Sequence, residues 1–93
     1  MKKYRLIYQS SNIEAPEGSF DIGRANECNL ILDDPSVSRR HALIVSEPPK
    51  SLRVLDDRSL NGVQVNGKAV EWTRLGDGDE LAIGSFRLYA LEA

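Results

Sequence analysis

The sequence predicts an all-β fold, a sandwich or a barrel, in a single domain covering residues 1–93. Turn signals made of Gly, Pro and Asn-Gly recur at intervals of about 8–12 residues, which is the spacing of short strands in such folds. The segments between these signals are short and rich in Val, Ile, Leu and Tyr. Apolar runs such as Ala42–Val45 reach no more than four residues, whereas a membrane helix needs about 20.

Turn signals separate the first four predicted strands. Pro16-Glu17-Gly18 and Gly23 flank the second strand, Asp34-Pro35 follows the third, and Pro48-Pro49 follows the fourth. Gly and Pro break strands because Gly tolerates unusual backbone angles and Pro lacks an N–H for the ladder. The strands themselves are Tyr4–Tyr8, Ser19–Ile22, Leu30–Leu32 and His41–Val45.

The last four predicted strands are bounded in the same way. Asn61-Gly62 and Asn66-Gly67 are strong turn signals on either side of a three-residue apolar segment. Gly76-Asp77-Gly78 precedes the final pair of strands, and Gly84 divides them. In that pair the apolar and polar positions alternate, so that odd and even residues face opposite sides of a sheet. These strands are Leu52–Leu55, Val63–Val65, Glu80–Ile83 and Phe86–Leu91.

The segment from Asp34 to His41 has two interpretations. Asp34 as N-cap and Pro35 at the first helical position are typical of a helix start. Against this, the run that follows ends at Pro48 and is dominated by β-branched residues, which favour a strand. We therefore prefer the strand on the local pattern.

Composition narrows the function classes. The chain has 12 basic and 14 acidic side chains, a net charge of −2, which argues against binding to bulk nucleic acid. One cysteine cannot form an internal disulfide, and together with one histidine it cannot build a structural zinc site. We therefore expect a cytoplasmic domain with no metal, no cofactor and no membrane segment.

Catalysis is a poor interpretation of the sequence. Ser38 and His41 are three residues apart, but no Gly-x-Ser-x-Gly elbow accompanies them, and a lone histidine at the start of an apolar strand is more often buried and hydrogen-bonded. The acidic pairs at 33–34 and 56–57 lack the spacing of a calcium loop and suit turn capping. We expect a protein that is not an enzyme.

Arginines in predicted loops give the strongest functional signal. Arg24, the pair Arg39-Arg40, and Arg58 each accompany small residues with hydroxyl, amide or bare backbone groups. Arginine forks beside such groups suit a phosphate or a carboxylate. If the loops meet, they form a small cationic pocket that fits one phosphorylated side chain. The alternative, scattered solvated charges, is equally compatible with composition and spacing alone.

Six blocks of the sequence carry a resemblance to a known family. They are Phe20-Asp21-Ile22-Gly23-Arg24, Cys28-Asn29-Leu30-Ile31-Leu32-Asp33, Ser38-Arg39-Arg40-His41-Ala42, Ser59-Leu60-Asn61-Gly62, Val65-Asn66-Gly67 and Leu75-Gly76-Asp77-Gly78-Asp79. In this order and spacing the blocks resemble the forkhead-associated (FHA) domain. The resemblance extends from about Tyr4 to Leu91. It implies a two-sheet β-sandwich of about eleven short strands with negligible helix, and it makes residues 33–40 a loop.

The resemblance also implies a function, which is non-catalytic recognition of phosphothreonine in a partner protein, as an adaptor in Ser/Thr-kinase signalling. Arg24 and Ser38 would contact the phosphate, with Arg39 adding a backbone N–H and a side-chain fork. Asn61 would bind the main chain of the peptide. Matched positions that shape the loops without touching the ligand are Gly23, His41 and Gly62.

Three positions depart from the pattern of the family. Leu60 stands where many relatives have Ser or Thr, so one hydroxyl bond to the phosphate is lost. Arg58 stands where glycine is common, and Val63 where threonine is common. We assign Leu60 and Arg58 accessory roles at the phosphate site.

A second reading is a phosphate-independent interaction or oligomerisation module that uses a sheet face or edge. Trp72, with Val70 and Leu75 nearby, would form its patch, although a partly buried tryptophan is the more ordinary outcome. For either reading we expect the chain to be a domain of a larger protein or a small monomeric adaptor.

Overall fold

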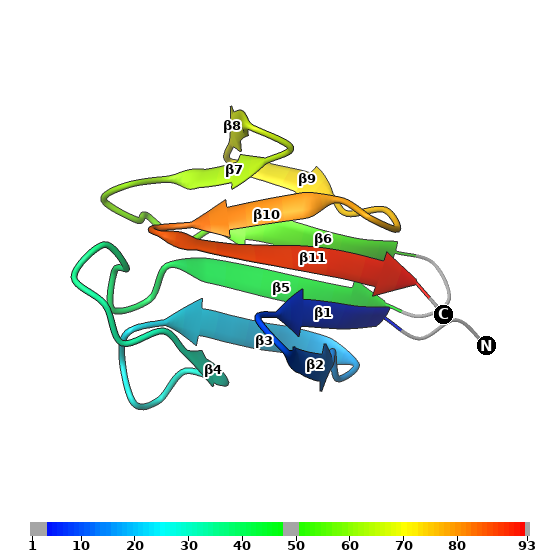
Figure 1. Ribbon diagram of the computed structural model, residues 1–93, viewed down its shortest axis with the longest axis horizontal. Coiled ribbons are helices and arrows are strands. Elements are labelled where there is room, and N and C mark those ends of the chain that lie inside the picture. Colours follow the sequence, from blue (N-terminus) through cyan, green and yellow to red (C-terminus); the bar gives the residue numbers. More distant parts are fainter. Residues whose placement is uncertain (1–3, 48–50, 93) are drawn as a thin grey trace.

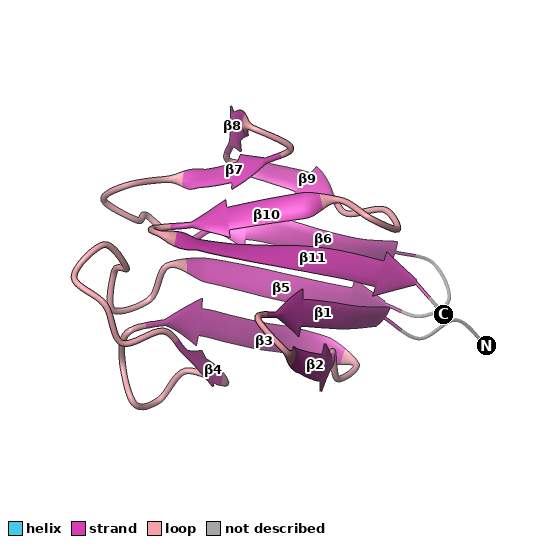
Figure 2. Ribbon diagram, in the orientation of Figure 1, coloured by secondary structure: helices cyan, strands magenta, loops and turns pink. Residues whose placement is uncertain are grey.

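The described residues of the chain form eleven β-strands in two sheets that pack face to face, as the computed structural model shows (Figures 1 and 2). The structure describes residues 4–47 and 51–92. Throughout these ranges there is no helix, and accordingly no helical stretch that could cross a bilayer. The expected two-sheet sandwich is confirmed.

One sheet has six strands in the described part of the chain, and its neighbouring strands run antiparallel. The first strand of the chain pairs with the last one, so that the two ends of the chain lie side by side in this sheet. In spatial order the strands are β2 (Ser11–Glu14), β1 (Tyr4–Tyr8), β11 (Phe86–Glu92), β10 (Glu80–Ile83), β7 (Val63–Val65) and β8 (Lys68–Val70).

The other sheet has five strands. Its one parallel pair joins β3 to β4, and the remaining neighbours are antiparallel. In spatial order the strands are β4 (Leu30–Ile31), β3 (Gly18–Gly23), β5 (Ala42–Glu47), β6 (Ser51–Asp56) and β9 (Trp72–Arg74).

All eight strands predicted from local pattern are present, with small shifts at their ends. The local pattern missed β2, β8 and β9, which lie at sheet edges and have few buried positions. Edge strands bury little, so they lack the apolar alternation that identifies a strand. Asn66 and Gly67 form the tight turn between β7 and β8 with φ values of 53° and 82°, as the Asn-Gly signal predicted.

The core lies between the two sheets and is filled by alternate side chains of the central strands. In β10 and β11 the buried and exposed positions alternate as expected. The largest fully buried apolar side chains are Leu6, Ile22, Leu32, Ile44, Leu52, Leu81, Ile83 and Leu88. Ser46 is also buried, and its Oγ has no hydrogen-bond partner in the described part of the chain.

Three connections emerge from the same end of the sandwich, at the left of Figure 1. They are residues 24–41, which include the short strand β4, residues 57–62 between β6 and β7, and residues 84–85 between β10 and β11. Residues 33–40 form a loop, so the helix alternative is wrong and the strand reading holds. We call these three connections the loop end.

Candidate functional site

Hydrogen bonds tie the three connections of the loop end together. The backbone carbonyl of Ser36 accepts the Asn61 side-chain amide at 2.9 Å, and the Ser36 hydroxyl accepts the Ser85 backbone N–H at 2.9 Å. The Ser38 hydroxyl accepts the Leu60 backbone N–H at 2.9 Å. Loops far apart in the sequence therefore share one fixed surface.

Arg24 is held at the base of this surface by two bonds to the neighbouring loop. Its backbone N–H donates to the Ser38 carbonyl at 3.0 Å, and its Nε donates to the Val37 carbonyl at 3.1 Å. The residue is exposed, and among the described residues no carboxylate forms an ion pair with its guanidinium. Its two terminal nitrogens remain as donors in a pre-oriented fork.

Gly23 allows this close approach of the two loops. A Cβ at this position would lie 2.3 Å from the carbonyl oxygen of Arg39, far inside van der Waals contact. The same Arg39 carbonyl accepts the Ala25 N–H at 3.0 Å and the Cys28 thiol at 3.3 Å. Burial raises the pKa of that thiol. The glycine is thus required by packing, because its φ is not in the left-handed region.

Ser38 and Arg39 present donors at the surface beside Arg24. The Ser38 hydroxyl accepts one bond from a backbone N–H, so its own proton remains to be donated. The side chain of Arg39 is exposed. The backbone bonds place Arg24 next to Ser38 and Ala25 next to Arg39, so that guanidinium and hydroxyl donors, which suit an oxyanion, occur on neighbouring loops.

His41 joins the Ser38 loop to the turn at Gly62 and is completely buried. Its Nδ1 accepts the Ser38 backbone N–H at 3.0 Å, and its Nε2 lies 2.7 Å from the Gly62 carbonyl. Because a carbonyl only accepts, Nε2 carries the proton. Both ring nitrogens are used in the scaffold, so the imidazole cannot serve the Ser38 hydroxyl as a general base.

The loop between β6 and β7 is shaped by its own side chains. Asp56 Oδ1 accepts the Ser59 N–H at 2.8 Å, and the Ser59 hydroxyl accepts the Gly62 N–H at 2.9 Å. The turn capping expected of Asp56 and Ser59 is therefore observed. Asn61 is exposed and uses its Nδ2 to reach the Ser36 carbonyl, which leaves Oδ1 as an acceptor toward solvent.

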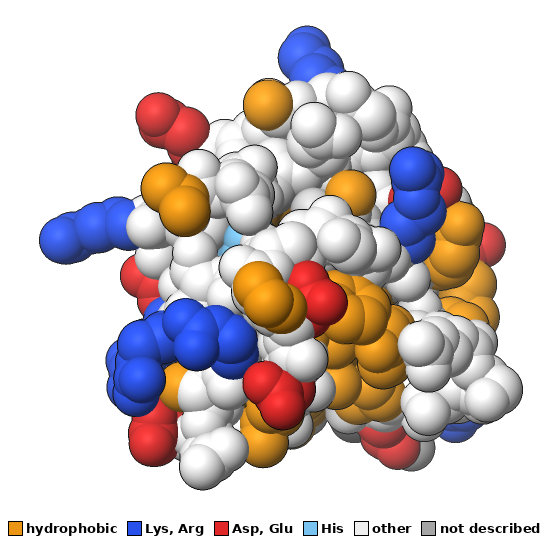
Figure 3. All heavy atoms as spheres, turned by 60° about the vertical axis from the view of Figure 1, so that its left-hand side comes forward, with side chains coloured by type: hydrophobic (Ala, Val, Ile, Leu, Met, Phe, Trp, Pro, Cys, Tyr) orange, Lys and Arg blue, Asp and Glu red, His pale blue; other side chains and the backbone are white. Residues whose placement is uncertain are grey.

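Two of the three departures from the family pattern, Arg58 and Leu60, lie on this loop, and the third, Val63, begins β7. Arg58 is exposed and adopts a φ of 55°, the left-handed backbone that glycine adopts without strain. The side chain of Leu60 is 89% exposed, and the residue contributes its backbone N–H to Ser38. Figure 3 turns the loop end forward and shows basic side chains gathered on one side of it.

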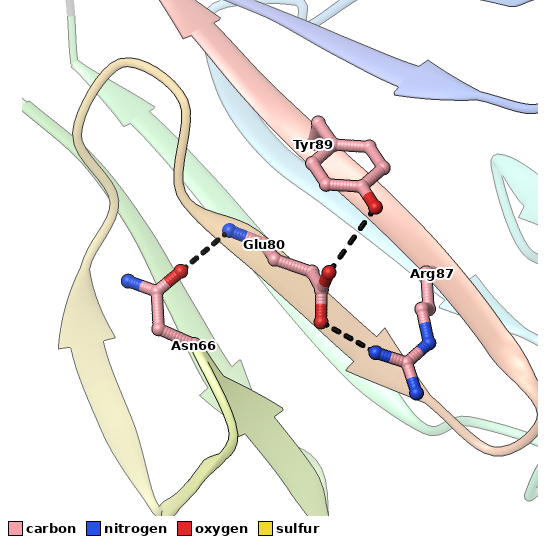
Figure 4. Close-up of polar contacts among 4 residues, drawn as sticks. All are labelled: Asn66, Glu80, Arg87 and Tyr89. Atoms are coloured by element: carbon pink, nitrogen blue, oxygen red, sulfur yellow. Dashed lines mark hydrogen bonds and ion pairs between the residues drawn. The ribbon is translucent and has the colours of Figure 1, made fainter.

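A hollow of about 190 Å³ adjoins Asn61 on the outer surface of the six-stranded sheet. Arg87 lines it and is paired with Glu80 at 2.8 Å. Figure 4 shows that Glu80 also accepts the Tyr89 hydroxyl, while its backbone N–H donates to Asn66. The carboxylate of Glu80 raises the pKa of Tyr89 through that hydrogen bond. Arg87 is thus held in place at the wall of the hollow.

The role of Ser36, which joins the three connections of the loop end, was not predicted from the sequence. Its hydroxyl and its backbone N–H both donate to Asp34 Oδ2, and these bonds lower the pKa of the Asp34 carboxyl. Asp34 is therefore the cap of a turn and not of a helix. The Asp-x-Ser spacing is typical of such turns and was the available signal.

Comparison with known proteins places the chain in one family. The family model described as FHA domain matches residues 20–84. The chain is 40% identical over 75 residues to the ABC transporter ATP-binding/permease protein Rv1747 of Mycobacterium tuberculosis, covering 81% of this chain and 9% of that protein. It is 45% identical over 69 residues to the glycogen accumulation regulator GarA of Mycolicibacterium smegmatis, covering 74% and 43%.

Solved structures agree with the family match. A structure from a structural and functional analysis of phosphothreonine-dependent FHA domain interactions superimposes with a TM-score of 0.90 at 29% identity. The match covers 96% of this chain and 95% of that one. By contrast, the chain spans less than half of the length of the two curated relatives above.

Proposed function

The chain belongs to the forkhead-associated (FHA) domain family, and we propose that it binds a phosphothreonine in a partner protein through the loop end. One observation carries this proposal: Arg24 is bonded through its backbone to Ser38, and both retain side-chain donors at the surface. A fixed guanidinium beside a hydroxyl proton is arranged for an anion before any ligand arrives.

The charges at the loop end fit a single phosphate. A phosphate monoester has a charge of about −1.5 to −2 at pH 7 and three acceptor oxygens. Arg24 and Ser38 would donate to these oxygens, with Arg39 adding a backbone N–H and its guanidinium. Well-formed charge-assisted bonds contribute about 1.5–3 kcal/mol each. After the cost of ordering a flexible peptide, affinities of about micromolar, or −8 kcal/mol, are expected.

The peptide main chain would lie beside Asn61. Its free Oδ1 can accept a backbone N–H from the peptide, and the bond from its Nδ2 to Ser36 fixes the amide orientation. The adjoining hollow would receive peptide residues next to the phosphothreonine. Arg58 would add charge near the phosphate, and Leu60 would contribute through its backbone only.

Binding without catalysis is the activity that these groups support. The imidazole of His41 is buried with both nitrogens bonded, which leaves Ser38 without a base and gives His41 a bracing role. The relative GarA is named as a regulator, which suits an adaptor in Ser/Thr-kinase signalling. We propose a cytoplasmic module, either a domain of a longer protein or a small adaptor, that needs no metal or cofactor.

The test compares phosphorylated and unphosphorylated forms of a threonine peptide library by fluorescence polarisation. We expect Arg24→Ala and Ser38→Ala to abolish binding of the phosphorylated form while the fold, followed by circular dichroism, is unchanged. Lys68→Ala is the matched control, because Lys68 is an exposed cation on β8 and not at the loop end. Binding should weaken as salt rises. Full affinity in both loop-end variants would refute the assignment.

A further inference from the structure

The outer face of the five-stranded sheet carries apolar side chains where a solvent-facing antiparallel sheet is normally polar. Register places Leu43, Leu55 and Trp72 side by side on β5, β6 and β9. Cross-strand partners point to the same face, and this is the face opposite the core residues Ile44 and Val54. The three therefore form a continuous apolar row on the outside of the domain.

Trp72 is the most exposed part of this row, with 60% of its surface accessible. The second reading expected Val70 and Leu75 in this patch, but Val70 belongs to the other sheet and Leu75 is buried in the core. The tryptophan is partly buried, as the ordinary expectation had it, but most of its surface is accessible. An exposed tryptophan is a frequent anchor of protein interfaces.

The next row along the same strands is cationic. Val45, Arg53 and Arg74 are neighbours in register on β5, β6 and β9. Two arginines directly opposite each other are unfavourable in an isolated sheet. Glu47 pairs with Arg53, whereas Arg53 Nε is buried and has no hydrogen-bond partner within residues 4–47 and 51–92. The arginine pair therefore has unused donor capacity that one carboxylate does not satisfy.

These two rows border a hollow of about 360 Å³ lined by Glu47, Ser51, Arg53, Trp72 and Arg74. Two guanidinium groups and one carboxylate give this lining a net charge of +1, on a chain whose net charge is −2. The features of the hollow, an indole and an excess of guanidinium donors, are complementary to carboxylates placed next to large apolar side chains.

We propose that this outer patch, defined as Leu43, Leu55, Arg53, Trp72 and Arg74, is a second docking surface that binds an acidic, leucine-containing segment of a partner protein. Carboxylates of the segment offset the repulsion between Arg53 and Arg74. Apolar side chains of the segment cover Trp72 and the apolar row that it belongs to. A second copy of this chain is less suited, because two cationic rows would face one another.

The outer patch is separate from the loop end, so the two surfaces can act together. The loop end gathers residues at the ends of β3, β6 and β10, whereas the patch lies on the outward face of β5, β6 and β9. A partner that carries both a phosphothreonine and an acidic segment engages two sites at once, which raises the total affinity through effective concentration. The proposal for the patch does not depend on the proposal for the loop end.

The experiment uses Trp72 as its reporter, because it is the only tryptophan of the chain. Its emission is followed during titration with a short synthetic peptide of glutamate and leucine, and with matched peptides of lysine and leucine or of glutamate alone. We expect a saturable change with the first peptide and none with the lysine peptide. The glutamate peptide should bind more weakly, since it lacks the apolar contact.

Charge reversal tests the position of the site. Arg74→Glu should weaken the affinity for the glutamate–leucine peptide by about tenfold or more. Lys68→Glu makes the same change of charge on β8 of the other sheet and should leave that affinity within about twofold. Phosphothreonine peptide without acidic residues should not displace it. Equal weakening by the two variants, displacement by the phosphopeptide, or concentration-dependent emission without any peptide would each overturn the proposal, the last in favour of self-association.

Discussion

His41 offers the sharpest test of how the loop end is built. His41→Ala removes the acceptor for the Ser38 N–H and the donor for the Gly62 carbonyl, both at a fully buried position. Each buried group left without a partner costs about 1–3 kcal/mol. The two together should lower the free energy of unfolding by about 2–6 kcal/mol, a large part of the roughly 5–15 kcal/mol that a domain has.

Two conservative variants separate the two bonds. In His41→Asn the short amide can reach where Nδ1 lies and accept the Ser38 N–H, while in His41→Gln the longer amide can reach the Gly62 carbonyl. Each should recover about 1–3 kcal/mol of the alanine loss. His41→Asn should also recover more phosphopeptide affinity, because it restores the bond that holds the Ser38 loop.

Urea denaturation followed by circular dichroism measures the stabilities, and fluorescence polarisation at low temperature measures phosphopeptide affinity where each variant is folded. A loss of less than about 1 kcal/mol for His41→Ala would contradict the bridging role. So would His41→Asn and His41→Gln variants that are no more stable than the alanine variant, since the stabilising element would then not be the pair of hydrogen bonds.

Four further predictions follow from single features. Gly23→Ala places a methyl group against a backbone carbonyl and should cost about 1–3 kcal/mol and weaken phosphopeptide binding; unchanged affinity by calorimetry would contradict it. Ser46→Ala removes a buried hydroxyl without a partner and should raise the free energy of unfolding by about 1 kcal/mol in urea. Arg74→Thr removes a like charge opposite Arg53 and should add about 0.2–1 kcal/mol, measured in the same way at low salt. The pKa of the Asp34 carboxyl is lowered by its hydrogen bonds from Ser36. The stability that this carboxylate contributes is therefore present above the ordinary carboxyl range and is lost as pH falls through the lowered pKa. In thermal melts across pH, Asp34→Asn should reduce the loss of stability at acid pH.

The sequence alone predicted eight of the strands, the family and the residues of the candidate site. Val, Ile and Leu between Gly, Pro and Asn-Gly signals predicted eight strands because burial on alternate faces and turn geometry are local properties. The ordered blocks around Arg24, Ser38 and Asn61 predicted the family, which the family model confirmed. The edge strands β2, β8 and β9 were not predicted, because exposed positions accept almost any residue.

Only the tertiary structure decided how these residues act together. The bond from Arg24 to Ser38, the bridge made by His41 and the role of Ser36 as a hub all join loops that are distant in sequence. The opposition of Arg53 and Arg74 beside Trp72 depends on the register between β6 and β9. Pairing of this kind is set by the packing of the whole sandwich, and no local pattern encodes which distant side chain will become a neighbour.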